Sequence, residues 1–270
     1  MKIAFIGGGN MAAALIGGLI KRGTFAADIY AIDINDEARA RTAQQFGIET
    51  GALIDAKLAS FDAVVIAVKP QVMKGVAEAL APHLSKQTII SIAAGIRATD
   101  ISRWLNGYTQ IVRTMPNRPA LIGMGVTGLA ALPGVSEEAK ALASQVLEVV
   151  GAAVWFDDEA KLDAVTAISG SGPAYVFYFI EAMQEAARQL GMDEEQGCAL
   201  AVATFTGAAQ LAAQSGEPAS VLCERVTSKG GTTAAALAAF DAQGVKAAIV
   251  KGALAAEARA KEMGDEFGAA

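Results

Sequence analysis

Three small residues near the start of the chain have the spacing of a phosphate-binding turn. Gly7, Gly9 and Ala12 fit G-x-G-x-x-A, directly after the apolar run Ile3–Ile6 and before a helical pattern. In this context the first glycine permits a tight turn, the second lets backbone approach a pyrophosphate, and the alanine permits close helix–strand packing. N–H groups at the helix start near Asn10 would bind the phosphates. The segment therefore predicts dinucleotide binding.

The next apolar run ends on a carboxylate. Asp33 follows Tyr30-Ala31-Ile32, where dinucleotide-binding folds place an acidic residue. An acid at this position binds the ribose hydroxyls of NAD and repels the additional phosphate of NADP. The segment Asp33-Ile34-Asn35-Asp36 also has the composition of a turn that caps the following helix. The pattern leaves both roles open, and with them the choice between NADH and NADPH.

Three further segments could face a bound dinucleotide. Each follows an apolar run: Val68-Lys69-Pro70, Ala93-Ala94-Gly95 and Arg113-Thr114-Met115-Pro116-Asn117. Open α/β sheets bind ligands outside the carboxyl ends of their strands, so these segments are expected at one edge. Lys69 could equally be a solvated surface lysine, and the alanine–glycine turn could serve packing alone. Asn117 could order its own loop or meet the nicotinamide end.

Two loops in the second half combine glycine with hydroxyl side chains. The first is Thr227-Ser228-Lys229-Gly230-Gly231-Thr232-Thr233, directly before a helical pattern. Backbone N–H groups at such a helix start, together with Ser and Thr hydroxyls, form an anion site. The same residues would also suit an ordinary N-cap at Thr232 or Thr233. Ser169-Gly170-Ser171-Gly172-Pro173 is the second loop, and its alternative role is a helix-breaking link between domains.

Groups for metal or strong-base chemistry are scarce. The chain has one histidine and two cysteines, Cys198 and Cys223, without ligand spacing, so neither a metal site nor a disulfide framework is expected. His83 follows Ala81-Pro82 in a loop away from the strand ends, and we expect it at the surface. Proton transfer would then fall to a hydroxyl, water or lysine. That suits a substrate whose nitrogen is already cationic.

The elements that must position these groups differ between the two halves. Up to Trp155, apolar β-branched runs alternate with helical patterns, which predicts a Rossmann-like, doubly wound α/β domain with a parallel sheet. The expected strands are Ile3–Ile6, Ile29–Ile32, Ala63–Val68, Thr88–Ile92, Gln110–Arg113 and Gly125–Leu129, and the helices Met11–Lys21, Glu37–Phe46, Val72–Leu80 and Ile101–Leu105.

Beyond Phe156 only helices are expected. Their ranges are Lys161–Ile168, Pro173–Leu190, a helix opened by Asp193 and ended at Ser215-Gly216, Pro218–Val226, Thr233–Gln243 and Val245–Met263. We predict a dinucleotide-binding domain over residues 1–156 and an all-α substrate-binding and dimerisation domain over residues 157–270. Small residues at helical spacing, such as Ala201 and Ala208, let helices approach closely. A thin domain this rich in alanine is expected to complete its core against a second copy.

Composition bounds the partners and the location. With 22 basic and 28 acidic side chains, a net charge of −6 and no basic run, the chain is not expected to bind nucleic acid or a membrane surface. The apolar stretch from Lys2 to Ile20 is interrupted by glycines and Asn10, so it does not have the pattern of a secretory signal. We expect a soluble, cytoplasmic protein.

Together these segments resemble the pyrroline-5-carboxylate reductases, the enzymes of the last step of proline biosynthesis. The resemblance spans the chain and is carried by FIGGGNM, AVKPQ, SIAAG, TMPN, ISGSGPAYVF and VTSKGGTTAAAL, of which the last is closest to the family's signature segment. It implies cofactor contacts at Ile6, Gly7, Gly8, Gly9, Asn10, Met11, Ala67, Val68, Lys69, Pro70, Ala93 and Ala94. It implies a substrate site at Ser228, Gly230, Gly231, Thr232 and Thr233.

The resemblance also implies NADPH as cofactor, with NADH as the alternative, and an intertwined helical homodimer that can assemble into rings such as decamers. Two features of this chain depart from the family. Lys229 stands where many relatives carry proline, and Asp33 argues against NADPH.

A mechanism follows as a hypothesis. The carboxylate of 1-pyrroline-5-carboxylate binds at Ser228 to Thr233, where the helix dipole favours negative charge. The resemblance places Thr233 near the ring nitrogen as the catalytic hydroxyl, and the protonated imine accepts hydride from the nicotinamide.

Two alternatives stay open. A β-hydroxyacid dehydrogenase has a similar two-domain architecture, but such enzymes resemble each other in a lysine on the first interdomain helix, and Ala174-Tyr175-Val176-Phe177-Tyr178 contains none. A non-catalytic dinucleotide sensor would use the helical half only to oligomerise. The Ser228–Thr233 loop argues against a sensor, which needs no small-anion site.

Overall fold

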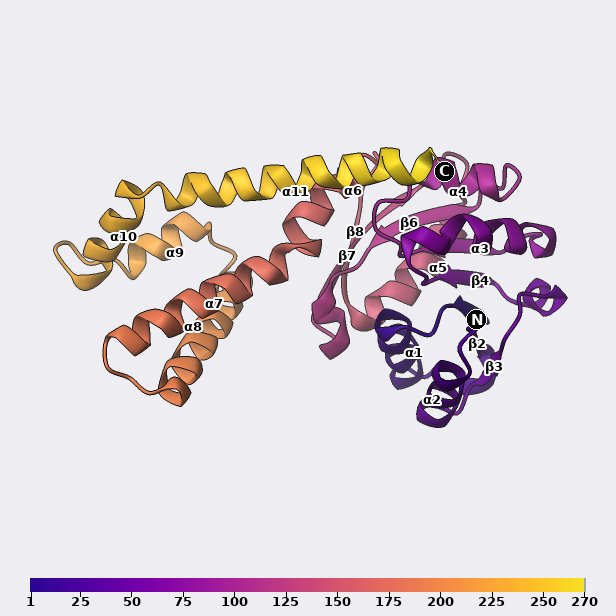
Figure 1. Ribbon diagram of the computed structural model, residues 1–270, viewed down its shortest axis with the longest axis horizontal. Helices are drawn as coiled ribbons and strands as arrows, with labels where there is room; N and C mark the ends of the chain where they lie inside the picture. Colours follow the sequence, from indigo (N-terminus) through magenta and orange to yellow (C-terminus); the bar gives the residue numbers. More distant parts are fainter. Residues whose placement is uncertain (270) are drawn as a thin grey trace. The chain divides into compact units, whose positions relative to one another are not determined.

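One eight-stranded sheet organises the first half of the chain in the computed structural model, which describes residues 1–269 (Figure 1). The strands are β1 (Ile3–Ile6), β2 (Ile29–Ile32), β3 (Glu49–Gly51), β4 (Ala63–Ile66), β5 (Thr88–Ser91), β6 (Ile111–Met115), β7 (Gly125–Ala131) and β8 (Gly151–Trp155). β1, β2, β4 and β5 are buried along their whole length, because apolar runs of this kind are covered on both faces.

The strand order creates a switch point in the sheet. The order is β3-β2-β1-β4-β5-β6-β7-β8, so the chain builds outward from β1 to β3 and then returns to the other side of β1 with β4. β1 pairs parallel with both β2 and β4. In open α/β sheets this reversal leaves a crevice outside the carboxyl ends of the two central strands.

Helices cover both faces of the sheet, which confirms the predicted doubly wound α/β class (Figure 1). They are α1 (Asn10–Lys21), α2 (Asp36–Phe46), α3 (Met73–Leu80), α4 (Ala98–Trp104) and α5 (Glu137–Leu147). Successive side chains of β1 enter different cores: Ile3 and Phe5 pack with α1 and α5, whereas Ala4 and Ile6 pack with α3 and α4. Alternation of this kind is the strand period of two.

β7 departs from the parallel order that the sequence predicts. It pairs antiparallel with β6 and parallel with β8. Between β6 and β7 the chain contains only the short 3-10 turn Arg118–Ile122, whereas a parallel return needs a crossover of about a dozen residues or more. The last two strands therefore run opposite to the other six.

The apolar runs also fail to predict β3, β8 and α5. β3 has three residues and an exposed Glu49, and β8 alternates between exposed and half-buried residues. Both lie at the edges of the sheet, where pairing with a neighbour decides the conformation. α5 begins after Ser136, whose hydroxyl accepts the N–H of Ala139 at 3.2 Å.

The remainder of the described chain is helical. Its helices are α6 (Lys161–Val165), α7 (Gly172–Gln189), α8 (Glu194–Ser215), α9 (Ala219–Arg225), α10 (Thr232–Ala242) and α11 (Val245–Gly268), with a π-helical turn at Thr166–Gly170. Asp193 caps α8 as predicted, since its carboxylate accepts the N–H of Gln196 at 2.8 Å in a full capping box. The helix predicted over Lys161–Ile168 is instead α6 followed by the π-helical turn.

The chain divides into two compact units. Unit 1 comprises residues 1–171 and 256–270, and unit 2 comprises residues 172–255. This division differs from the boundary at residue 156 because α6 packs on β7, where Val165 and Leu162 crowd Gly128. The end of α11 also belongs to unit 1, where Asp265 pairs with Arg97 at 2.6 Å. That hydrogen bond raises the pKa of Arg97 above its ordinary value.

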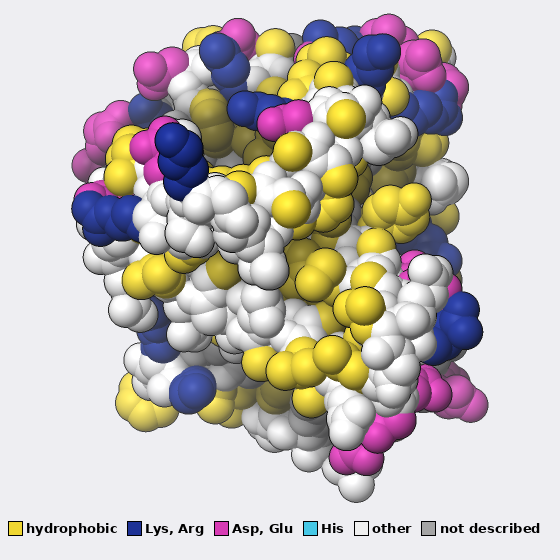
Figure 2. All heavy atoms as spheres, turned by 90° about the vertical axis from the view of Figure 1, so that its left-hand side faces the viewer, with side chains coloured by type: hydrophobic (Ala, Val, Ile, Leu, Met, Phe, Trp, Pro, Cys, Tyr) yellow, Lys and Arg dark blue, Asp and Glu magenta, His cyan; other side chains and the backbone are white. Residues whose placement is uncertain are grey.

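Unit 2 has almost no core of its own. Its buried residues among those described are Ala187, Gly197 and Ala201, all small and all at the packed pair α7 and α8. Hydrophobic side chains are instead spread over its surface (Figure 2). The large exposed ones are Val176, Phe177, Tyr178, Met183, Leu190, Met192, Leu200, Val202, Leu211, Val226, Phe240, Ile249, Val250 and Leu254. Exposed apolar area on this scale marks an interaction surface.

No single described helix is long and apolar enough to cross a membrane, while the bent pair α10 and α11 passes that test of length and composition when taken together.

Candidate active site

The segments singled out in the first half start from one edge of the sheet. Ile6 is the partner of Ile32 in β2 and of Ile66 in β4. Ser91 in turn pairs with Ile66 and with Arg113. The chain leaves these strands at Gly7, Asp33, Ala67 and Ile92, so the glycine turn, the acid and the loops after β4 and β5 lie at the same carboxyl edge.

The glycine turn has the geometry that a pyrophosphate requires. Gly7 has φ +100°, and a Cβ there would lie 2.5 Å from the carbonyl oxygen of Ala67 in the neighbouring loop. A Cβ on Gly9 would meet nothing within 4 Å, so that backbone is open to a ligand. Ala12 is fully buried against the sheet. These three environments match the three roles that the sequence assigns to the turn.

Two helices begin directly after an uncapped N-cap glycine, and they are the two that the sequence assigns to anions. α1 and α10 both follow a glycine in extended conformation, Gly9 and Gly231, with no side-chain cap and no acid in the first turn. By contrast α2, α5 and α8 have side-chain caps and acids in their first turns. Free N–H groups without nearby carboxylates leave the positive end of the helix dipole available to a phosphate or carboxylate.

The Asp33 carboxylate accepts hydrogen bonds from two backbone N–H groups. Its Oδ2 accepts the N–H of Gly8 at 2.7 Å, and its Oδ1 accepts the N–H of Asn35 at 2.9 Å. Asn35, rather than Asp33, caps α2 by accepting the N–H of Ala38 at 2.8 Å. The carboxylate is thus at the glycine turn and also shapes the loop before α2.

The remaining cofactor candidates line the loops after β4 and β5. Lys69 is exposed and immediately precedes the 3-10 turn Pro70–Val72. Ala67, Val68 and Pro70 are half-buried, whereas Ala93 is buried and Ala94 half-buried. Of these residues, Lys69 is the one whose side chain is exposed to a ligand at this edge.

Asn117 orders loops. Its Nδ2 donates to the carbonyl oxygen of Ser169 at 3.1 Å, and its Oδ1 accepts the N–H of Val126 at 2.9 Å. The side chain ties the end of β6 to the π-helical turn. In that turn a Cβ on Gly170 would lie 2.6 Å from the methyl group of Met115. Both ends of the amide are therefore used to order these loops, while each end keeps a second donor or acceptor position.

The loop from Thr227 to Thr233 is a tight turn in unit 2 with open hydroxyls. The N–H of Gly231 donates to the carbonyl oxygen of Ser228 at 3.0 Å, and Gly230 has φ +75°, which defines a type II turn. A Cβ on Gly231 would collide with the Ser228 hydroxyl. Lys229 occupies the turn position where proline is common, so its charge does not disturb the backbone.

The hydroxyls at this helix start are not used within the chain. The Thr227 hydroxyl donates to the carbonyl oxygen of Cys223 at 2.6 Å. The hydroxyls of Ser228, Thr232 and Thr233 have no hydrogen-bond partner in the described part of the chain. Ser228 and Thr232 are exposed and Thr233 is half-buried. The arrangement suits a small anion better than an ordinary N-cap, which would use one of these hydroxyls on the backbone.

Sequence reasoning overlooks a buried charge cluster. The Arg113 guanidinium is buried and contacts Glu159 at 3.1 Å and Asp163 at 3.2 Å. Glu159 also accepts the N–H of Ala98 at 2.6 Å. A lone arginine in the apolar strand Ile111–Met115 is the signal that could have revealed it, because a buried charge requires partners. Tyr175 is likewise unanticipated: its buried hydroxyl has no hydrogen-bond partner within residues 1–269.

The single histidine and the two cysteines lie outside the segments described above. His83 is half-buried in a short 3-10 turn, and both cysteines are free and exposed. Among residues 1–269 no group of His, Cys, Asp and Glu side chains could hold a metal ion.

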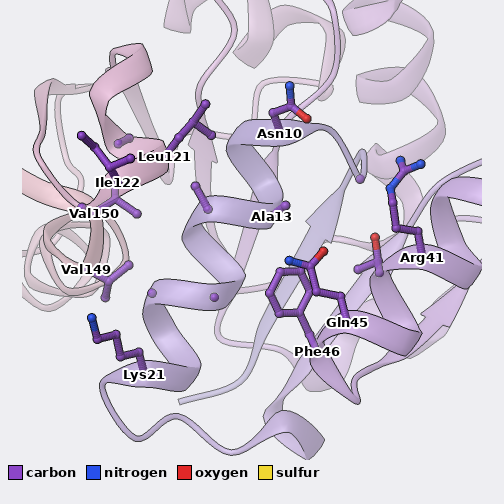
Figure 3. A pocket seen from close by; sticks show the side chains of 17 residues that line it. Asn10, Ala13, Lys21, Arg41, Gln45, Phe46, Leu121, Ile122, Val149 and Val150 are labelled. Carbon is purple, nitrogen blue, oxygen red and sulfur yellow. The ribbon is translucent and has the colours of Figure 1, made fainter. Parts of the chain in front are cut away.

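A cavity of about 740 Å³ follows the outer face of α1 rather than the strand ends (Figure 3). It is flanked by Arg41, Gln45 and Phe46 of α2 and by Leu121 and Ile122 on the other side. It reaches the glycine turn only at Gly8 and Asn10, and no residue of the loops after β4 and β5 lines it, so it is not the crevice described above.

Comparison with known proteins agrees with this geometry. Residues 2–95 match the family model described as NADP oxidoreductase coenzyme F420-dependent, and residues 159–263 match pyrroline-5-carboxylate reductase dimerisation. The chain is 46% identical to a pyrroline-5-carboxylate reductase of Pseudomonas aeruginosa, over 99% of this chain and 98% of that one.

Solved structures give the same result. One of a pyrroline-5-carboxylate reductase from Coxiella burnetii superposes with a TM-score of 0.92 at 37% identity, over 97% of this chain and 98% of that one. One of Plasmodium falciparum pyrroline carboxylate reductase with NADP bound has a TM-score of 0.86 at 27% identity, over 98% of each chain. The fold and the edge site define a nicotinamide-dependent oxidoreductase with a helical oligomerisation region. Within that class, the chain belongs to the pyrroline-5-carboxylate reductase family.

Proposed function

We propose that this protein reduces 1-pyrroline-5-carboxylate to L-proline with a reduced nicotinamide dinucleotide, the last step of proline biosynthesis. The observation that carries the proposal is the pair of uncapped, glycine-led helix starts, one in each unit. The start of α1 suits a pyrophosphate, and the start of α10, with its open hydroxyls, suits a small carboxylate. Membership of the family supplies the reaction in which both ligands take part.

The loop Ser228–Thr233 binds the carboxylate of the imine. Backbone N–H groups at the start of α10 and the hydroxyls of Ser228 and Thr232 donate hydrogen bonds to it, and the helix dipole stabilises its charge. The type II turn fixes these donors before substrate arrives, which lowers the entropy cost of orientation.

Thr233 handles the ring nitrogen. Its half-buried hydroxyl, which has no hydrogen-bond partner among the described residues, accepts the N–H of the protonated imine and fixes the ring. A bound nicotinamide supplies hydride to the carbon of the C=N bond, and the electron pair of that bond becomes the lone pair of the product amine. Because the imine is protonated before reduction, the chain needs no strong general base at this step.

The dinucleotide is held by Ile6 to Met11, by Ala67 to Pro70 and by Ala93 and Ala94. The open backbone at Gly9 and the uncapped start of α1 fit its pyrophosphate. The relative with NADP bound and the NADP-named family model favour NADPH as donor, with NADH as the alternative. Asp33 at the glycine turn argues for NADH, as developed below.

The assembly is a homodimer formed through unit 2, with dimers joined into a larger ring such as a decamer. The exposed apolar side chains of unit 2 and the match to a dimerisation family support self-association. Light scattering on the purified protein measures the mass of the assembly and therefore the number of chains in it.

Replacement of Thr233 tests the mechanism. Thr233→Ala is expected to lower kcat/KM for the imine by about a hundredfold, a typical contribution of a positioned proton-handling group. Thr233→Ser keeps the hydroxyl and should retain most of the rate. Dinucleotide affinity, measured by fluorescence titration, should be the same in both variants. Full turnover by Thr233→Ala would remove Thr233 from this role.

A further inference from the structure

The carboxylate of Asp33 is fixed at the mouth of the glycine turn. It accepts the N–H of Gly8 at 2.7 Å and that of Asn35 at 2.9 Å, one on each oxygen. A Cβ placed on Gly8 would lie 3.2 Å from Asp33 Oδ2, so the carboxylate lies directly over the turn. Each oxygen has a second lone pair, which can accept one more hydrogen bond.

The guanidinium that contacts the Asp33 backbone, that of Arg39, is already engaged. Arg39 donates through Nη1 to the carbonyl oxygen of Asp33 at 2.7 Å and is paired through Nη2 with Asp36. Because Asp36 already neutralises Arg39, that guanidinium does not compensate a second phosphate beside Asp33.

An apolar side chain stands beside the acid. Ile34 is 90% exposed, although it lies only two residues after the fully buried strand β2. A flat, apolar ring above Ile34 would cover it, and the adenine of a dinucleotide whose ribose contacts Asp33 has that character. Carboxylate and aliphatic side chain together present one polar and one apolar contact for an adenosine.

We propose that Asp33 makes the adenosine end of this site select NADH over NADPH. The inference rests on the dinucleotide site of the proposed function. The free lone pairs of Asp33 accept the 2′- and 3′-hydroxyls of the NADH ribose. The 2′-phosphate of NADPH would bring its charge against a carboxylate that two backbone N–H groups prevent from turning away, while Arg39 is neutralised by Asp36.

Binding of nicotinamide-free fragments tests this selection directly. The probes are ADP-ribose and 2′-phospho-ADP-ribose, titrated by calorimetry into the intact protein. The wild type is expected to bind ADP-ribose at least about tenfold more tightly, the effect of one repulsive charge contact near a surface. Equal or tighter binding of the phosphorylated probe would overturn the proposal.

Three variants locate the effect. Asp33→Asn removes the charge and keeps an acceptor for Gly8, and should bring the ratio of the two affinities to about one or below. Asp33→Ser covers the case in which asparagine disturbs the turn and abolishes binding of both probes. Glu37→Gln removes the same charge four residues away, on an exposed side chain, and should leave the ratio within about twofold. A ratio that follows Glu37 as strongly as Asp33, or that ignores Asp33, contradicts the assignment.

The fragments also separate this inference from the proposed reaction. They contain no nicotinamide and need no imine, so selection by Asp33 can hold in a protein that fails to reduce pyrroline-5-carboxylate. Conversely, an active reductase with no preference for ADP-ribose would support the proposed reaction and contradict selection by Asp33.

Discussion

At the residue scale, the two glycines of the first turn have different reasons to be glycine. Gly7 needs its left-handed φ and has no room for a Cβ beside Ala67, whereas Gly9 has room in the protein but faces the expected ligand. Substitution should therefore separate folding from binding at adjacent positions of one motif.

Gly7→Ala is expected to destabilise the protein by about 1–3 kcal/mol, because the side chain strains the backbone and collides with the neighbouring loop. Gly9→Ala should leave the free energy of unfolding nearly unchanged and weaken dinucleotide binding at least about tenfold, because its Cβ occupies the approach to the pyrophosphate. Chemical denaturation and ADP-ribose titration measure the two effects. The account fails here if Gly9→Ala binds normally or if Gly7→Ala is as stable as the wild type.

The sequence predicts residue roles well where a role depends on neighbours along the chain. The turn from Gly7 to Ala12 and the cap at Asp193 are local patterns, and both are observed. Asn117 left two roles open because its partner, Ser169, is 52 residues away. No local pattern contains that contact, so only the folded chain shows that Asn117 orders its loops. Its contact with a nicotinamide stays a prediction.

At the element scale, the buried cluster around Arg113 joins three elements of unit 1. Arg113 is on β6, Asp163 on α6, and Glu159 accepts the N–H of Ala98, the first residue of α4. α4 has no side-chain cap at its own N-cap position, Arg97, so a carboxylate from distant sequence stabilises its start. The cluster fixes where the helical half begins relative to the sheet within this unit.

Arg113→Met should destabilise the protein by about 3–5 kcal/mol, because it leaves Asp163 and Glu159 without their buried cation. Arg259 provides a matched surface control: it pairs with Glu262 and Glu266, is half exposed, and its replacement by Met should cost less than about 1 kcal/mol. Urea denaturation of both variants makes the comparison. Equal losses of stability in the two variants would show that the buried ion pairs of Arg113 contribute no more than the surface ion pairs of Arg259.

Strands with a continuous apolar run in their own sequence are predictable. Strands that form only by pairing with a neighbouring strand are not. The runs at β1, β2, β4 and β5 are continuous and apolar, and the structure places strands there. β3 and β8 have no such run and exist because a neighbouring strand offers hydrogen bonds at the sheet edge. The reversed direction of β7 follows from a short connection, which hydrophobic periodicity does not encode.

At the scale of the whole molecule, unit 2 explains why this family has a dimerisation region. Its buried residues among those described are three small ones, and its large apolar side chains face outward. The alanine-rich composition predicts self-association, and the family match confirms that coarse expectation. Composition does not predict that residues 157–171 and the end of α11 pack with the sheet, because those contacts join segments far apart in the chain.

The most direct test of the central claim is an assay of the purified wild-type protein with pyrroline-5-carboxylate and each reduced dinucleotide. Loss of the nicotinamide absorbance and formation of proline are followed together. We expect saturable oxidation, one proline for each dinucleotide consumed, and a higher kcat/KM with NADH than with NADPH. No oxidation of either dinucleotide, in protein that binds ADP-ribose, would contradict the assignment as an imine reductase.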